Sequence, residues 1–138
     1  MKDWTAIHEL LTGSLADFLA EVLPEIGGQD WWRTYVIEQL TPNQARAVNA
    51  LDEGDLLGLD LAALIRVTER NWPELRFKRS VSSDARALLG ELKVVRNRYA
   101  HAPVSGVPIE DQLRDADTAL RFIKAISGRE AYSLQAVG

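Results

Sequence analysis

The stretch SDARALLGELKVVRNRYAHAP, residues 83–103, is the part of the sequence that decides the fold. Ser83 and Asp84 are of the residue types that cap helix N-termini, and the apolar residues after them recur every three or four positions, as on one face of an α-helix. Pro103 ends this pattern, because proline cannot continue a helix. The stretch therefore predicts a long amphipathic helix, whose core stripe consists of Leu88, Leu92, Val95 and Tyr99.

Helical spacing also dominates the sequence before this stretch. A first helix is predicted from Trp4, ended by Pro24 with Gly27-Gly28, and a second from Asp30 to Leu40. A short third helix has Thr41 as its N-cap and Pro42 at its first position, and it runs to about Leu51. A fourth begins at Asp55 and reaches Trp72, where Pro73 stops it, and a basic connector leads to residue 83.

The sequence after residue 103 predicts one more helix. Pro108 suits its start, Gly128 its end, and its stripe is formed by Leu113, Ala116, Leu120, Ile123 and Ile126. No run of alternating β-branched residues indicates a strand. The sequence thus predicts an all-α fold, an antiparallel bundle of four to six helices over residues 1–127. Residues 128–138 show no stripe and are interpreted as a tail or a linker to a larger parent protein.

Composition limits the classes of protein that fit the sequence. The chain has 138 residues, of which 46% are hydrophobic and 26% charged, as expected of one soluble globular domain. It has no cysteine, and it shows neither a signal peptide nor an uninterrupted apolar span, so we expect a cytoplasmic protein. Its two histidines are far apart, and it has no glycine-rich phosphate loop. We therefore expect neither a metal nor a cofactor.

Charge is distributed unevenly along the chain. The net charge is −4, yet residues 66–98 contain nine basic and four acidic side chains. A basic middle in an acidic chain offers phosphate groups a local binding surface. The alternative is that these side chains form an ordinary solvated helix face.

The end of the long predicted helix carries the chain's most reactive group of residues. Asn97 and His101 are four residues apart and share a helix face, with Arg96 next to it. An imidazole transfers protons near neutral pH and a guanidinium binds two phosphate oxygens, so this pair suits attack of an RNA 2′-hydroxyl on its neighbouring phosphate. The alternative is that His101 and Arg98 only complement the negative end of the helix dipole.

The segment Leu92-x-x-Val95-Arg96-Asn97-Arg98-Tyr99-Ala100-His101 resembles the Arg-Asn…His segment of the HEPN superfamily. Further similar segments are Asp30-Trp31-Trp32, Asp55-Leu56-Leu57, Asn71-Trp72 and the final stripe from Asp115 to Ile126. Together they resemble the HEPN branch known from a nuclear mRNA-surveillance endoribonuclease of the Swt type. The resemblance covers about residues 3 to 127.

This resemblance implies a homodimer that cleaves RNA without a metal, at a cleft where two motif helices meet. It assigns the catalytic roles to Arg96, Asn97 and His101, while Arg98, Lys93, Lys78 and Arg79 are the predicted RNA-binding side chains. It also implies other domains in a larger parent protein, often one of a bacterial defence system. One HEPN toxin group has a modified tyrosine at the position of Pro103, so its regulation is not expected here. The alternatives are a non-catalytic dimerisation or docking module and, third, a nucleotide sensor.

Overall fold

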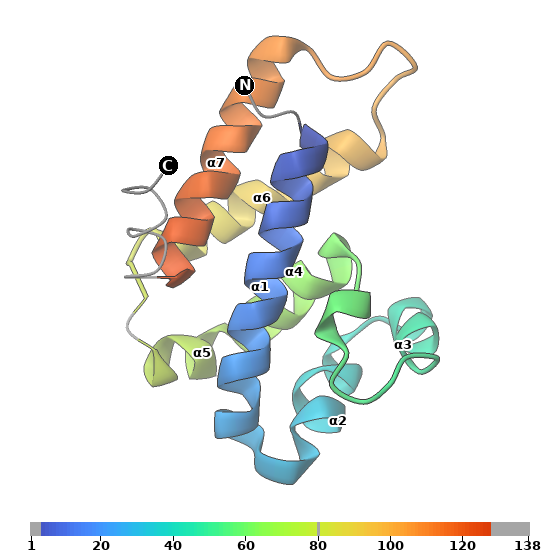
Figure 1. Cartoon of the computed structure of the whole chain (residues 1–138), viewed down its shortest axis with the longest axis vertical. Helices are drawn as coiled ribbons and strands as arrows, with labels where there is room; N and C mark the ends of the chain where they lie inside the picture. Colours follow the sequence, from blue (N-terminus) through green and yellow to red (C-terminus); the bar gives the residue numbers. More distant parts are fainter. Residues whose placement is uncertain (1–3, 80, 128–138) are drawn as a thin grey trace. The chain divides into compact units, whose positions relative to one another are not determined.

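The computed structural model describes residues 4–79 and 81–127, and within these ranges all regular structure is helical (Figure 1). The predicted all-α fold is confirmed, whereas residues 128–138, the predicted tail or linker, lie outside the described residues. No helix within the described ranges is long and apolar enough to cross a membrane. The α-helices are α1 Trp4–Gly27, α2 Trp31–Tyr35, α3 Pro42–Val48, α4 Leu61–Arg70, α5 Trp72–Lys78, α6 Ala85–Ala100 and α7 Ile109–Ser127.

The chain divides into two compact units. The first contains α6, α7 and the start of α1 up to Ser14, and the second contains residues 15–80. Three single-turn 3₁₀ segments, Gly28–Asp30, Ile37–Gln39 and Leu56–Gly58, connect helices of the second unit. Each unit buries apolar side chains of its own, such as Leu92 and Phe122 in the first and Leu64 and Leu75 in the second.

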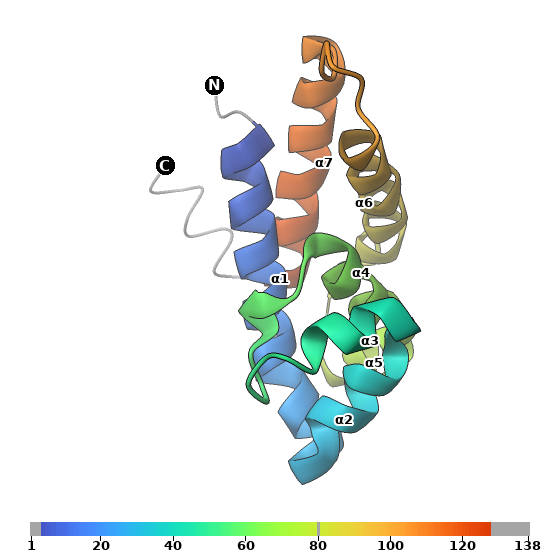
Figure 2. The ribbon, with the colours of Figure 1, turned by 90° about the vertical axis from the view of Figure 1, so that its right-hand side faces the viewer.

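In the first unit α6 and α7 pack against each other as an antiparallel pair (Figure 2). Ser82, before α6, donates its backbone N–H to the carbonyl of Ala125 near the end of α7. At the other end of the pair, Arg98 of α6 binds Asp115 in the first half of α7. The pairing of early with late residues fixes the antiparallel direction, and the short loop 101–108 between the helices permits it.

The register of α7 differs from the sequence-based prediction. Leu113 and Leu120 were expected in the core, but their side chains are 48% and 37% exposed. Ile123 and Ile126 of the predicted stripe are buried, together with Asp115, Thr118, Ala119 and Phe122. The prediction was wrong for Leu113 and Leu120 because it aligned the apolar residues alone, whereas the buried face includes a carboxylate that is neutralised by Arg98 of α6.

In the second unit, the cap predicted at Thr41 is confirmed. The Thr41 hydroxyl accepts a hydrogen bond from the Gln44 backbone N–H, and the Gln44 side chain accepts one from the Thr41 backbone N–H. This reciprocal pair satisfies two N–H groups that the first turn of α3 would otherwise leave unpaired.

Three other boundaries of the second unit were predicted wrongly. The helix expected to run to Leu40 ends at Tyr35, and the one expected from Asp55 begins at Leu61. Asp60 starts it, because its Oδ1 accepts the Ala63 backbone N–H at 2.8 Å. The supposed basic connector contains a helix, α5, which accommodates Pro73 in its first turn, where proline costs no hydrogen bond.

Candidate functional site

Helix α6 presents the predicted motif because its opposite face is anchored in the core. Leu88, Leu92 and Val95 are each at most 4% exposed. With 100° per residue, the positions that point away from this stripe are those of Val94, Asn97 and His101. Val94 is 58% exposed, and both Asn97 and His101 are exposed as well. The helix therefore displays an amide and an imidazole on its outward face.

The structure brings Arg96 into contact with this face. Arg96 lies nearer the buried stripe and is partly buried, yet its Nη1 donates a hydrogen bond of 3.3 Å to Oδ1 of Asn97. This bond directs the guanidinium around the helix toward the amide. Arg96 and Asn97 are thus joined by a side-chain hydrogen bond at the surface of α6.

His101 follows the last residue of α6 and occupies the C-cap position. Its backbone N–H donates to the carbonyl of Asn97 at 3.1 Å, so the backbone places the imidazole one turn beyond the Asn97 amide. Within the described residues its side chain makes no hydrogen bond or ion pair that would hold it in a structural role. His101 is also exposed, so its imidazole is accessible from solvent.

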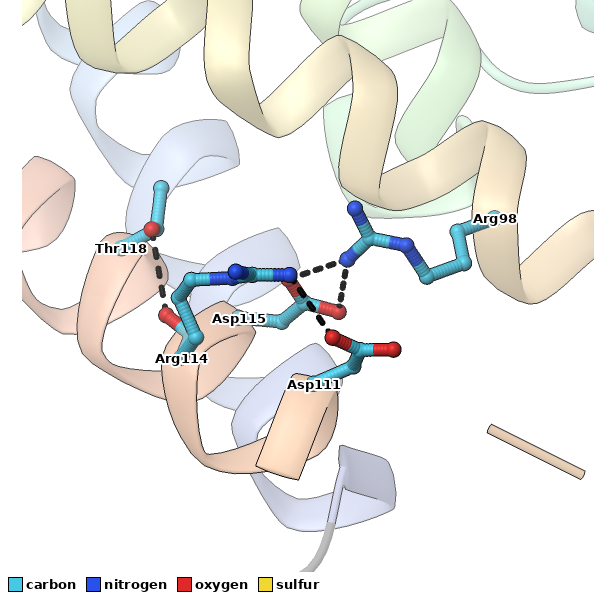
Figure 3. A network of polar contacts seen from close by, with 5 residues as sticks. All are labelled: Arg98, Asp111, Arg114, Asp115 and Thr118. Atoms are coloured by element: carbon cyan, nitrogen blue, oxygen red, sulfur yellow. Dashed lines mark hydrogen bonds and ion pairs between the residues drawn. The ribbon is translucent and has the colours of Figure 1, made fainter. Parts of the chain in front are cut away.

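Arg98 has a different environment from its neighbours in the motif (Figure 3). Its Nη1 lies 2.5 Å from both carboxylate oxygens of Asp115, whose side chain is only 3% exposed. Hydrogen bonding to this carboxylate raises the pKa of Arg98. Beside the pair, Arg114 binds Asp111 at 2.7 Å on the same helix. The predicted RNA contact Arg98 is thus an internal link between α6 and α7.

Tyr99 joins the motif helix to the start of α1. Its ring stacks on Trp4, with centroids 4.2 Å apart and planes 9° from parallel, and Trp4 also meets the ring of His8 edge-on. The Tyr99 hydroxyl is buried near Asp115 and makes no hydrogen bond of ordinary geometry within the described residues. Burial and then the negative charge of Asp115 raise the pKa of Tyr99 to about 12. Tyr99 is therefore a neutral packing residue at physiological pH, and His8 belongs to the same aromatic cluster.

The remaining predicted RNA-binding residues fall into two environments. Lys93 is exposed on α6, three residues before Arg96, and Lys78 is exposed in the last turn of α5. Arg79 is partly buried and binds Glu25 at 2.9 Å and Glu21 at 3.0 Å. Hydrogen bonding to Arg79 lowers the pKa of Glu25. Arg79 thus ties the end of α5 to α1, and its charge is already compensated.

Sequence reasoning missed the role of Asp115. It recognised the residue only as part of a similar segment, although a buried carboxylate requires a cation or several donors. The sequence did contain one signal, the helical spacing that places Asp115 on the same face of α7 as Thr118, Ala119 and Phe122. Only the antiparallel register shows that Arg98 meets it.

Among residues 4–79 and 81–127, no group of three or more histidine and acidic side chains lies close enough to hold a metal ion. The chemistry that the motif itself offers is proton transfer by an imidazole and charge stabilisation by a guanidinium. Phosphoryl transfer uses both kinds of chemistry, because the attacking hydroxyl must lose its proton and the negative charge that develops on the phosphoryl oxygens must be stabilised.

A family model described as Swt1-like HEPN matches residues 7–127. The chain belongs to the Swt1-like HEPN family. The match covers both compact units and includes the whole of α6 and α7, so the Arg96–His101 segment of this HEPN domain lies within it. No match was found among curated proteins or among solved structures.

Proposed function

We propose that this HEPN domain is a metal-independent endoribonuclease that acts as a homodimer. The observation that carries the proposal is the exposed face of α6. There Arg96 donates a hydrogen bond to Asn97, and the His101 imidazole makes no hydrogen bond or ion pair within the described residues. Leu92 and Val95 anchor the helix in the core from the other side.

In the proposed reaction, an RNA 2′-hydroxyl attacks the adjacent phosphorus and the bond to the 5′-oxygen of the next nucleotide breaks. His101 of one subunit removes the 2′-proton, and an imidazole returns a proton to the leaving 5′-oxygen. Arg96 stabilises the negative charge that accumulates on the phosphoryl oxygens, and Asn97 holds its guanidinium in place. Two subunits supply the two imidazoles that acid and base catalysis require, since the described residues of one chain bring only one imidazole to this face.

The products provide the direct test of this chemistry. Cleavage of a single-stranded RNA is expected to leave 2′,3′-cyclic phosphate and 5′-hydroxyl ends and to continue in excess EDTA. Mass spectrometry of the fragments distinguishes these ends. RNA with 2′-O-methyl groups serves as the matched substrate, because it lacks the nucleophile and is expected to stay intact. Cleavage that requires a divalent ion, or that also degrades DNA, would contradict the proposed mechanism.

The proposed dimer interface contains the outward face of α6. This face carries Val94, an exposed apolar residue beside Asn97 and His101. A valine that is 58% exposed on a helix is poorly covered in the monomer and is buried readily by a partner copy. Light scattering is expected to give about twice the chain mass of 15.4 kDa for the wild type. Val94→Arg is expected to give a monomer that no longer cleaves RNA.

Leu57→Arg is the matched control for this substitution, because Leu57 is 69% exposed in the second unit and lies outside the motif. It is expected to leave the mass and the cleavage unchanged. A wild-type protein that is monomeric at tens of micromolar would contradict the proposed dimer. A Val94→Arg variant that remains dimeric would show that the interface does not include the outward face of α6.

The second candidate function is a non-catalytic docking module. It is favoured by the apolar side chains of Ile109, Leu113 and Leu120, which form an exposed stripe along α7 at spacings of four and seven residues. A docking module predicts a folded wild-type protein without activity toward any RNA, and this outcome distinguishes the two functions.

A further inference from the structure

Phe77 is the one phenylalanine of the described residues that takes no part in the core. Its side chain is 93% exposed, whereas Phe122 is fully buried and Phe18 is partly buried. Helix α5 packs through Trp72 and Leu75, which are 8% and 0% exposed. The helix is therefore anchored without Phe77, and the exposed ring has no structural function in this unit.

The two residues next to Phe77 are exposed cations. Arg76 and Lys78 lie on either side of it in the last turn of α5, and neither forms an ion pair with any described residue. Since neighbouring helix positions diverge by about 100°, the ring has one positive charge on each side. Arg79, one residue further on, is compensated by Glu21 and Glu25. The positive charge of this segment that forms no ion pair within the described residues thus lies beside the ring, although the charge of Lys78 also contributes to lowering the pKa of Glu25.

We propose that Arg76, Phe77 and Lys78 form a binding site for single-stranded RNA, which we call the α5 site. This inference rests on the proposed function, because it names how the same enzyme holds its substrate. An unpaired base stacks on the Phe77 ring, and Arg76 and Lys78 bind the phosphates on its two sides. Double-stranded RNA does not fit, because its bases are already stacked and paired.

Charge favours RNA over a protein partner at the α5 site. An exposed aromatic ring between two cations matches the alternation of bases and phosphates in a single strand, and stacking is tolerant of base identity. A protein partner would instead be favoured by a cluster of several apolar side chains, and Phe77 is the only large exposed apolar residue of α5.

The test measures RNA binding by fluorescence anisotropy in a His101→Ala background, so that no RNA is cleaved. The probes are an unstructured labelled 12-nucleotide RNA and an oligonucleotide of the same length that keeps the sugar-phosphate chain and lacks the bases. Phe77→Ala is expected to weaken binding of the RNA by about 5- to 150-fold, the range for loss of one stacked base. It is expected to leave binding of the abasic chain nearly unchanged, and Phe77→Tyr is expected to restore the RNA affinity.

The charge variant Arg76→Glu/Lys78→Glu is expected to weaken binding of both probes and to reduce the dependence of affinity on salt. The controls are Leu57→Ala, an exposed apolar residue of the same unit, and Arg46→Glu, an exposed cation of the same unit. Both are expected to bind like the His101→Ala parent.

Equal RNA affinity for Phe77→Ala and its parent would overturn the α5 site, even if wild-type protein cleaves RNA. If Phe77→Ala keeps the RNA affinity and loses self-association in light scattering, the residue contacts protein, and the inference is wrong for that reason. A wild-type chain that binds the RNA through Phe77 but does not cleave it would contradict the proposed function alone.

Discussion

His101→Ala and Arg96→Ala are each expected to lower the rate of RNA cleavage by about 100-fold or more. Loss of a general acid or base, or of a donor that stabilises developing charge, typically has effects of this size. Both residues act in the transition state, so the loss is expected mainly in kcat, measured under saturating RNA. Arg96→Lys is expected to recover little, because an ammonium group lacks the fork that binds two phosphoryl oxygens.

The controls for this experiment come from the same chain. His8→Ala removes the other histidine, which packs against Trp4, and Arg46→Ala removes an exposed cation of the second unit. Both are expected to keep wild-type cleavage. Circular dichroism and light scattering are expected to show that the His101 and Arg96 variants remain folded dimers.

A different outcome is expected if His101 and Arg96 only complete the end of α6. Their replacement would then leave RNA processing unchanged and would lower the free energy of unfolding by about 1 kcal/mol, the scale of a charge at a helix terminus. A wild-type protein that is folded, dimeric and inert toward single-stranded and structured RNA would contradict the ribonuclease proposal and favour the docking module.

The motif helix could be predicted from sequence because its information is local. The apolar positions Leu88, Leu92 and Val95 set one face of α6, and the spacing of Asn97 and His101 then follows from helix geometry. The Swt1-like HEPN family match confirms the recognition made from these residues. The catalytic roles remain predictions.

The errors occurred where structure depends on distant residues. Asp115 could not be placed in the core of α7 without knowing that Arg98 lies opposite, because an unpaired carboxylate does not belong there. For Arg79, the sequence could not show that Glu21 and Glu25 on α1, more than 50 residues earlier in the chain, bind its guanidinium, and RNA binding by Arg79 remains a prediction. Pro73 was interpreted as a stop signal, although the first turn of a new helix accepts proline equally well.

The largest effect on stability is expected from Arg98→Met. The substitution keeps an unbranched, flexible side chain but removes the guanidinium, and it leaves Asp115, whose side chain is 3% exposed, without its cation. Removal of one partner of a fully buried pair costs about 3–5 kcal/mol, and here about 2–3 kcal/mol is expected, because the Arg98 side chain is 31% exposed and water can reach the site. Urea denaturation at one fixed protein concentration measures the change in the free energy of unfolding.

The reciprocal variant completes a double-mutant cycle. Asp115→Leu is expected to cost less than Arg98→Met, because the freed guanidinium can turn toward water. The double variant Arg98→Met/Asp115→Leu buries no unpaired charge, so it is expected to lose less stability than the two single changes added together, by about 1–2 kcal/mol. Strict additivity would show that the two side chains do not form the pair in solution.

The same three variants decide between the two roles of Arg98. If Arg98 contacts RNA, as its place in the motif predicted, then Asp115→Leu releases the guanidinium and is expected to maintain or strengthen RNA affinity, whereas Arg98→Met weakens it. If Arg98 instead positions the end of α6, each single variant loosens the helix that carries His101, and both are expected to lower kcat with little change in KM. The structure favours the second role, because both Asp115 oxygens are already bound to the same guanidinium nitrogen. RNA affinity that falls in Arg98→Met alone, with kcat intact in both variants, would contradict it.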